Sequence, residues 1–270
     1  MLRFQNKVVW VTGASAGLGR GMALVFAREG GRVAVSGRRQ DRLNELVAEI
    51  EAAGGVATAI PCDVSDDESV ASAVSEVVSR FGRLDVAVAN AGFGVGGRFE
   101  TIGIDDWRRQ LDVNVLGLVS TARHALPHLT RSRGRLALIG SVAGIIPGPG
   151  SAPYAASKAA VQSIGQTLSV ELHGSGVTCT TILPGFVESE IGQVDNQGAF
   201  RSDWTDRRPR GIMWPTARAA EVMVTAIEKR KREYVFTIHG RLGALFGRHA
   251  PGLIHLLMVR FARISPPRGG

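Results

Sequence analysis

Short apolar runs rich in valine alternate with longer segments in which apolar residues recur at helical spacing, from residue 7 to about residue 238. The short runs predict seven strands, over residues 7–11, 32–36, 56–60, 85–89, 135–139, 177–183 and 234–238. The longer segments predict helices over residues 17–29, 40–53, 66–81, 105–131, 153–173 and 217–231. Because strands that alternate with helices are typical of βαβ units, we predict an α/β fold in a single domain, with a doubly wound seven-stranded parallel sheet and helices on both faces.

Two segments depart from this alternation. Residues 188–215 are polar, rich in glycine, aspartate and arginine, and contain two tryptophans, so they predict a long loop or helical flap. Beyond the last strand, two short apolar segments over residues 242–247 and 253–261 are separated by Ala250-Pro251-Gly252. We therefore divide the chain into a main domain over residues 1–240, which includes the flap, and a C-terminal extension over residues 241–270.

The composition excludes several classes of protein for this chain. The chain has 270 residues, of which 44% are hydrophobic and 21% charged, which excludes a disordered polyelectrolyte and allows a sizeable core. Cys62 and Cys179 lie far apart without a CxxC or Cys/His spacing, so we predict small buried side chains, no metal site and no disulfide framework. The first residues lack the apolar stretch of a signal peptide, and no run of 18 uncharged apolar residues predicts a spanning helix. The resulting expectation is a cytoplasmic location.

The net charge of +8 comes from the C-terminal quarter of the chain. Residues 1–200 hold 18 basic and 19 acidic side chains, whereas residues 201–270 hold 14 basic and 5 acidic ones. Such a charge raises the alternative of a nucleic-acid binder, whose affinity would depend steeply on salt. The chain shows no nucleic-acid motif, so we predict no nucleic-acid partner.

A glycine-rich turn follows the first predicted strand. It has the spacing GxxxGxG between a strand and an amphipathic helix, and its sequence is Thr12-Gly13-Ala14-Ser15-Ala16-Gly17-Leu18-Gly19. Glycines there let the backbone approach a pyrophosphate and present amide donors at the start of the helix. A second match over residues 144–150 contains two prolines and no helical run, so only the first match predicts a dinucleotide site.

The residues after the second strand bear on the choice of cofactor. Folds that bind NAD place a carboxylate there for the adenosine ribose, whereas this chain has Ser36-Gly37-Arg38-Arg39. Arginine suits a ribose 2′-phosphate because the guanidinium is planar, bidentate and permanently charged. We assign that role to Arg38 and predict NADP(H) in preference to NAD(H), while Arg39 fits a solvated helix start.

Tyr154 and Lys158 are spaced four residues apart in a predicted helix. At that spacing both side chains emerge on one face, so their polar ends can meet one small molecule. The phenol titrates at about pH 10 and is a poor base at neutral pH, but a nearby ammonium favours the phenolate and lowers its pKa. The pair therefore predicts general acid–base chemistry, with a half-exposed aromatic beside a surface lysine as the alternative.

With these motifs in order, residues 6–238 resemble the short-chain dehydrogenase/reductase (SDR) family, whose fold is Rossmann-like. The resemblance implies a catalytic set of Asn114, Ser141, Tyr154 and Lys158. Together with Arg38, the cofactor-binding residues that it implies are Gly13, Ser15, Gly17, Leu18, Gly19, Asp63, Val64, Asn90, Ala91, Gly92, Tyr154, Lys158, Pro184, Gly185, Val187 and Ser189. One position departs from the family pattern, because Ser189 stands where threonine is usual, which keeps a hydroxyl.

The resemblance also implies a reaction, hydride transfer between a nicotinamide and the carbon of a carbonyl or secondary alcohol. In reduction, Tyr154 would donate a proton to the carbonyl oxygen, and Ser141 would donate a hydrogen bond to it. Lys158 would lower the pKa of Tyr154 and bind the nicotinamide ribose, and Asn114 would hold a water that links Lys158 to solvent. A regulatory module that senses NADP(H) without turnover is the alternative.

Substrate contacts are expected beyond the carboxyl ends of the strands, in residues 93–98, residues 145–150 and the flap. The large side chains there are mostly apolar, which predicts a lipophilic ketone, aldehyde or alcohol as substrate; they are Phe93, Ile145, Ile146, Phe186, Trp204, Met213 and Trp214. The flap also carries four arginines that fit either an acidic group of a ligand or solvent, namely Arg201, Arg207, Arg208 and Arg210.

The C-terminal extension leaves three interpretations open. Arginines occur at intervals along and beside its apolar segments, and no acidic residue follows Glu233. Residues 241–264 fit packing on the substrate cleft, a subunit interface, or peripheral contact with an anionic membrane surface. We expect a homo-oligomer, either a dimer or a tetramer, and place packing and dimerisation ahead of membrane contact because the apolar stretches are short.

Overall fold

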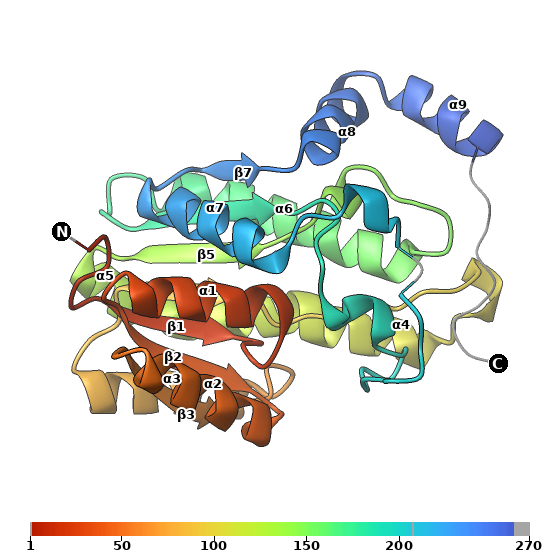
Figure 1. Cartoon of the computed structure of the whole chain (residues 1–270). Helices are drawn as coiled ribbons and strands as arrows, with labels where there is room; N and C mark the ends of the chain where they lie inside the picture. Colours follow the sequence, from red (N-terminus) through yellow and green to blue (C-terminus); the bar gives the residue numbers. More distant parts are fainter. Residues whose placement is uncertain (1, 207, 262–270) are drawn as a thin grey trace.

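The computed structural model describes residues 2–206 and 208–261, and within them seven strands form one parallel sheet in the order β3-β2-β1-β4-β5-β6-β7 (Figure 1). The predicted α/β fold in a single domain is therefore confirmed. The strands are β1 Val8–Thr12, β2 Arg32–Gly37, β3 Val56–Pro61, β4 Val86–Ala89, β5 Arg135–Ile139, β6 Thr178–Leu183 and β7 Glu233–Val235.

Strand β1 shows why the strands are continuous apolar runs. Val9 and Val11 belong to one hydrophobic core, whereas Val8 and Trp10 belong to the core on the opposite face of the sheet. A parallel sheet covered on both faces has this pattern because neither face meets water. The indole N–H of Trp10 donates to the hydroxyl of Ser36 at 2.9 Å, so its buried polar atom is satisfied.

Helices cover both faces of the sheet. One face packs against α1 Gly17–Arg28, α2 Gln40–Ala52 and α7 Thr216–Glu228. The other face packs against α3 Asp67–Phe81, α5 Gly117–Ser132 and α6 Ala152–Glu171. Figure 1 shows α1 and α7 side by side on one face of the sheet. Because the strand order reverses between β1 and β4, the carboxyl ends of these two strands border the crevice where doubly wound sheets bind ligands.

The helix predicted over residues 105–131 contains a turn that periodicity does not predict. It begins as α4 Ile104–Leu111, passes through a π-helical turn, η2 Asp112–Leu116, and continues as α5. A π turn inserts a residue into the helical repeat and often marks a functional position. Asn114 lies in the middle of this turn.

The last predicted strand and the C-terminal extension differ from expectation. Strand β7 ends at Val235 instead of residue 238, because the hydroxyl of Thr237 accepts a hydrogen bond from the Gly240 N–H at 3.1 Å and caps a helix. This helix is α8 Ile238–His249, and α9 Pro251–Phe261 follows it at an angle of 116°. Within the described residues no single helix is long and apolar enough to cross a membrane, although α8 and α9 pass that test as a bent pair. Residues 262–270 of the predicted extension lie outside the described residues.

Short 3₁₀ turns complete the structure. The flap holds η4 Glu190–Gln193 and η5 Arg210–Ile212, as expected for a long loop with little regular structure, while η1 Phe99–Thr101 and η3 Val142–Gly144 follow β4 and β5. Isolated bridges join Val187 to Trp214 and Val194 to Phe200, so the flap folds back on itself. Arg207 lies outside the described residues.

Candidate active site

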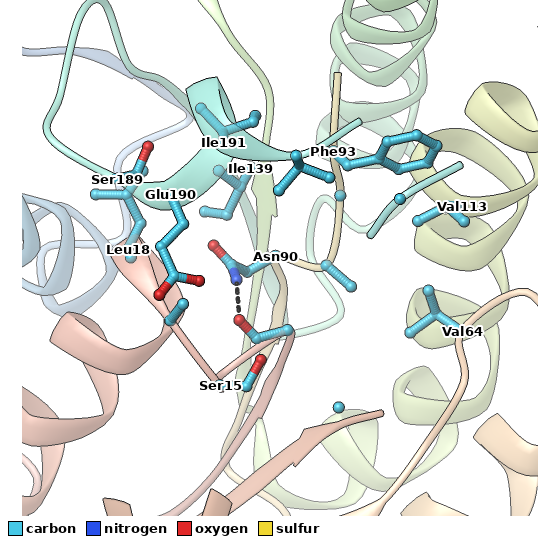
Figure 2. A pocket seen from close by; sticks show the side chains of 18 of the residues that line it. Ser15, Leu18, Val64, Asn90, Phe93, Val113, Ile139, Ser189, Glu190 and Ile191 are labelled. Carbon is cyan, nitrogen blue, oxygen red and sulfur yellow. Dashed lines mark hydrogen bonds between the residues drawn. The ribbon is translucent and has the colours of Figure 1, made fainter. Parts of the chain in front are cut away.

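A cavity of about 590 Å³ lies at the carboxyl ends of β1, β2, β4, β5 and β6 (Figure 2). Arg38 follows β2 and Ser141 follows β5, three strand spacings apart, so the cavity extends over about 14 Å of sheet edge. Nearly all of the predicted site residues line it. The two that do not are Gly19 and Asn114.

The glycine loop forms one wall by keeping side chains out. Gly13 has a positive φ of 64°, and a Cβ atom there would lie 2.6 Å from the Cα atom of Ala91. Gly17 has a φ of 52° and faces Ser189 of the flap. Gly19 lies behind the loop, where a Cβ would be 2.4 Å from the carbonyl oxygen of Gly13, so its role is close packing of α1 on β1. A loop of this kind fits the pyrophosphate of a dinucleotide.

Asn90 fixes this loop in place. Its side-chain amide donates to the carbonyl oxygens of Thr12 at 2.9 Å and Gly13 at 3.1 Å, and its backbone N–H donates to the Thr12 hydroxyl (Figure 2). The turn at Asn90-Ala91-Gly92 therefore ties the end of β4 to the end of β1. Asn90 shapes the cavity with its amide already engaged by the backbone.

Both arginines after β2 line the cavity, and Arg39 makes the closer contacts. The Arg39 guanidinium donates to the Ser15 hydroxyl through Nε at 3.2 Å and Nη2 at 3.1 Å, and its Nη1 lies 2.9 Å from a carboxylate oxygen of Glu190. Arg38 donates to the carbonyl oxygen of Gly198 in the flap at 3.3 Å. Arg39 stands at the start of α2, as predicted, and its partly exposed side chain also contacts both the glycine loop and the flap.

Asp63 and Val64 line the cavity after β3. A carboxylate oxygen of Asp63 accepts from the N–H of Ser65 at 3.0 Å and from its hydroxyl at 2.7 Å. Val64 fills the space that Gly117 leaves open at the start of α5, where a Cβ would lie 2.7 Å away. These contacts hold the β3 end of the cavity in one conformation.

Tyr154 and Lys158 lie one turn apart on α6 and both face the cavity. The Lys158 Nζ is 5.8 Å from the centre of the Tyr154 ring and donates to the carbonyl oxygen of Ile139 at 2.8 Å. The Lys158 side chain is only 5% exposed, and burial lowers its pKa to about 8. A cation is therefore held next to the phenol in a place where solvent screens it little.

Asn114 lies behind the cavity wall and holds the segment that carries Gly92 and Phe93. Its amide donates to the Phe93 carbonyl oxygen at 3.0 Å and to the Ser157 hydroxyl at 3.1 Å, and its side-chain oxygen accepts from the Phe93 N–H at 3.1 Å. Ser157 in turn donates to the carbonyl oxygen of Tyr154 at 2.7 Å. Because both amide hydrogens are used, the side chain keeps only one oxygen lone pair for a further partner.

Ser141 and the residues after β6 complete the wall opposite the glycine loop. The Ser141 hydroxyl accepts from the Ala143 N–H at 3.1 Å and faces the cavity, as do Pro184, Gly185, Val187 and Ser189. Two side chains hold the segment after β6: Arg208, one of the four flap arginines, and His239, which the sequence motifs do not indicate. Arg208 donates to the carbonyl oxygens of Val187 at 3.0 Å and Ser189 at 2.8 Å. The Nε2 of His239, at the start of α8, accepts from the Phe186 N–H at 2.9 Å.

The substrate-side side chains expected from the sequence are mostly elsewhere. Phe93 lines the cavity, but Ile145 and Ile146 lie under Gly247 and Gly243 of α8. Phe186 lies against His239, and Trp214 packs on Phe236 of the core. Trp204 and Met213 are also absent from the described cavity wall. Besides Val64, Pro184 and Val187, the larger apolar side chains that the structure does place there are Leu18, Phe93, Val113, Ile139, Ile191, Val194 and Phe200.

The two cysteines are buried, as predicted. Cys62 borders the cavity, and burial raises the pKa of its thiol to about 11, which keeps it protonated and a poor nucleophile. Within residues 2–206 and 208–261, no group of three His, Cys, Asp or Glu side chains is arranged to hold a metal ion.

The model of the short chain dehydrogenase family matches residues 7–199. The chain belongs to this family. It is 35% identical over 192 residues to a 3beta-hydroxysteroid dehydrogenase of Mediterraneibacter gnavus. The aligned region covers 71% of this chain and 70% of the relative.

Two solved structures share the fold. One is a short chain dehydrogenase/reductase of Burkholderia phymatum in complex with NAD, with a TM-score of 0.83 and 24% identity over the whole of both chains. The other is an alcohol dehydrogenase of Thermococcus sibiricus complexed with 5-hydroxy-NADP, with a TM-score of 0.74 and 27% identity over 86% of this chain and 96% of that one. The chain is thus an SDR oxidoreductase that acts on alcohol or carbonyl groups, and the enzyme names of its relatives favour this over the cofactor-sensing alternative.

Proposed function

We propose that this chain is an NADP(H)-dependent dehydrogenase or reductase of a lipophilic carbonyl or alcohol. The observation that carries the proposal is a single elongated cavity that has Ser141, Tyr154 and Lys158 in one part and the glycine loop with Arg38 and Arg39 in another. The glycine cradle and the length of the cavity fit a dinucleotide, since a Cβ at Gly13 would close the approach of the backbone.

A bound nicotinamide supplies or accepts the hydride. In the direction of reduction, the Tyr154 hydroxyl donates a proton to the carbonyl oxygen, and the Ser141 hydroxyl donates a hydrogen bond to the same oxygen as negative charge develops. The Lys158 ammonium stabilises the negative charge that Tyr154 acquires when it loses this proton. Asn114 acts as a positioning residue, because it fixes Phe93 directly and Tyr154 through Ser157.

The preference for NADP(H) follows from the charge at the end of β2. Arg38 and Arg39 both line the cavity at the end of β2, the position at which dinucleotide-binding folds recognise the adenosine ribose. Two guanidiniums favour a ribose that carries a 2′-phosphate, since charge-assisted hydrogen bonds to phosphate are about twice as strong as neutral ones. Of these two, Arg39 is held by the Ser15 hydroxyl and is the better positioned.

The substrate class follows from the apolar side chains of the cavity wall. Phe93, Val113 and Ile139 come from the body of the domain, and Ile191, Val194 and Phe200 come from the flap. Figure 2 shows Phe93, Ile139 and Ile191 around the same opening. An apolar wall with a few polar groups for orientation suits a lipophilic substrate, and a relative that acts on steroids is consistent with this.

A panel of aldehydes, ketones and alcohols of increasing chain length, assayed with NADPH and NADH, tests the proposal. We expect kcat/KM to rise about fourfold for each methylene that the cavity buries, because each contributes about 0.8 kcal/mol, and to be higher with NADPH. A preference for short charged carbonyls, or for NADH, would contradict the proposed substrate class or cofactor respectively. Assembly into a homo-oligomer and a cytoplasmic location stay predictions.

A further inference from the structure

Helix α8 has a small-residue face that packs against the domain. A Cβ at Gly243 would lie 2.8 Å from the Cδ1 atom of Ile146, and a Cβ at Gly247 would lie 2.8 Å from the Cγ2 atom of Ile145. Ala244, on the same face, is buried. Helix α8 therefore packs closely against the loop after η3. Ile145 and Ile146 of that loop occupy the space that side chains at Gly243 and Gly247 would fill.

The opposite face of α8 carries large apolar side chains that are exposed. Ile238, Leu242, Leu245 and Phe246 recur at helical spacing and are all exposed, Leu245 to 53%. Helix α9 adds four more exposed apolar side chains, those of Leu253, Leu256, Leu257 and Val259, of which Leu256 is 62% exposed. These eight side chains are here called the α8–α9 apolar face. Figure 1 shows the two helices on the outside of the domain beside β7, with α9 projecting from it.

The charged side chains of α8 and α9 themselves are all basic. No aspartate or glutamate follows Glu233 in the sequence, whereas Arg241, Arg248 and Arg260 lie along the two helices. Arg248 is paired with Glu233, and Arg241 donates to the carbonyl oxygen of Val235, so these two lie beside β7 at the flank of the face. Helices with an apolar strip, flanking arginines and no acidic residue of their own have the composition of helices that lie in the headgroup region of anionic bilayers.

We propose that the α8–α9 apolar face docks on the surface of a lipid bilayer that contains anionic lipids. A second copy of the chain is the competing occupant, but a twofold interface brings the same patch from both copies together. The arginines of the two copies would then lie near one another, and Glu233, the carboxylate beside them, is already paired with Arg248, whereas an anionic headgroup layer attracts arginine side chains. Helices of 12 and 11 residues are about 18 and 17 Å long, which suits lying along the bilayer surface.

This surface adjoins the active site. Helix α8 covers Ile145 and Ile146, and His239 at its first turn holds Phe186 beside the cavity residues Pro184 and Gly185. A docked protein would therefore have its cavity close to the layer in which a lipophilic molecule accumulates. The docking itself is independent of the proposed reaction, since it rests on the exposed face and its charge.

Vesicle flotation of the full chain tests the proposal. The wild-type protein is compared on phosphatidylcholine vesicles and on vesicles with about one third phosphatidylglycerol, beside a Leu245→Glu/Leu256→Glu variant. The matched control is Val56→Glu/Val170→Glu, which places two carboxylates at exposed valines on β3 and α6, away from the extension. NADPH binding and far-UV circular dichroism of each variant show whether it is folded.

We expect the wild type and the control to float with the anionic vesicles, and a several-fold smaller fraction of each to float with phosphatidylcholine vesicles. The Leu245→Glu/Leu256→Glu variant should stay folded, and its bound fraction should be at least tenfold smaller. Wild-type protein that fails to float, or a Leu245/Leu256 variant that floats as well as the control, would overturn the proposal. A dimer in ultracentrifugation that this variant abolishes, without vesicle binding by the wild type, would assign the face to a second copy and likewise overturn it.

Discussion

The glycine loop after β1 and the glycines of α8 both allow close approach, but to different partners. At Gly13 a side chain is excluded by backbone, the Cα atom of Ala91, and φ is positive. At Gly243 the neighbour is the end of the Ile146 side chain, and the backbone is ordinary helix. The first arrangement keeps a cavity free for a ligand, whereas the second fills the space with the chain's own side chains. Glycines of the first kind tolerate no change, and those of the second kind tolerate change when a side chain can move.

Alanine substitutions at Gly13 and Gly243 test this difference, and Gly13→Ala should have the larger effect. We expect Gly13→Ala to lower the free energy of unfolding by about 3 kcal/mol, from the positive φ and the backbone clash, and to abolish measurable NADPH binding. Gly243→Ala should change the free energy of unfolding by less than about 1 kcal/mol, because alanine favours the helix while Ile146 shifts. Urea unfolding and NADPH fluorescence titration measure both variants. Equal losses in the two variants would contradict the distinction.

The buried Lys158 of the cavity should make the free energy of unfolding depend on pH. Burial lowers the pKa of Lys158 from 10.5 to about 8, so between these pH values the unfolded chain holds a proton that the folded chain has lost. The free energy of unfolding therefore rises with pH in this window, by about 2 kcal/mol between pH 8 and pH 10 relative to Lys158→Met. Urea unfolding of both proteins without cofactor at these two pH values measures it. Parallel pH profiles would show that the lysine is not desolvated.

The choice between NADPH and NADH tests the different roles of Arg38 and Arg39, the two arginines that follow β2. We expect Arg39→Ala to weaken NADPH binding about tenfold and NADH binding less than twofold, because it removes a guanidinium already oriented by Ser15. Arg38→Ala should have a smaller effect, since within the described residues its side chain makes one hydrogen bond, to the Gly198 carbonyl oxygen at 3.3 Å. Dissociation constants for both cofactors check this. If NADPH and NADH weaken equally, neither arginine reads the 2′-phosphate.

The smallest expected effect concerns Glu190, which pairs with Arg39 across the cavity. Its carboxylate competes with a phosphate for the guanidinium, so Glu190→Gln should tighten NADPH binding about threefold and leave NADH binding unchanged. The effect is modest because both side chains are partly exposed and the ion pair is screened. Glu188→Gln is the matched control, since Glu188 is exposed and does not line the cavity. Weaker NADPH binding in Glu190→Gln would mean that the pair closes over the cofactor instead.

The strands and the placement of Tyr154 beside Lys158 were predictable because their signal is local. Valine runs buried on both faces indicate parallel strands, and Tyr154 and Lys158 are brought together by a single helical turn. The π turn at Asn114 was not predictable, because one inserted residue leaves the apolar pattern of a long helix almost unchanged.

Contacts between distant segments were the harder part. Arg39 meets Glu190, Arg208 meets Ser189, and His239 meets Phe186, none of which is signalled by spacing along the chain. Apolar residues were misassigned for a related reason. Trp214 and Ile146 are as apolar as Phe93, but whether such a side chain faces a cavity, the core or another helix depends on packing that the sequence pattern does not contain.

The central claim is that Tyr154 transfers the proton in the reaction. The chain has 2 tyrosines. The second, Tyr234, is on β7 and does not line the cavity that the structure describes. The Nζ atom of Lys231 lies 4.2 Å from the centre of its ring. Tyr154→Phe and Tyr234→Phe therefore remove the same hydroxyl from two tyrosine–lysine pairs. With a substrate found in the carbonyl panel, we expect Tyr154→Phe to lower kcat/KM about 10³-fold with the NADPH dissociation constant within about twofold, and Tyr234→Phe to change neither. Turnover by Tyr154→Phe within a few-fold of the wild type would contradict the assignment.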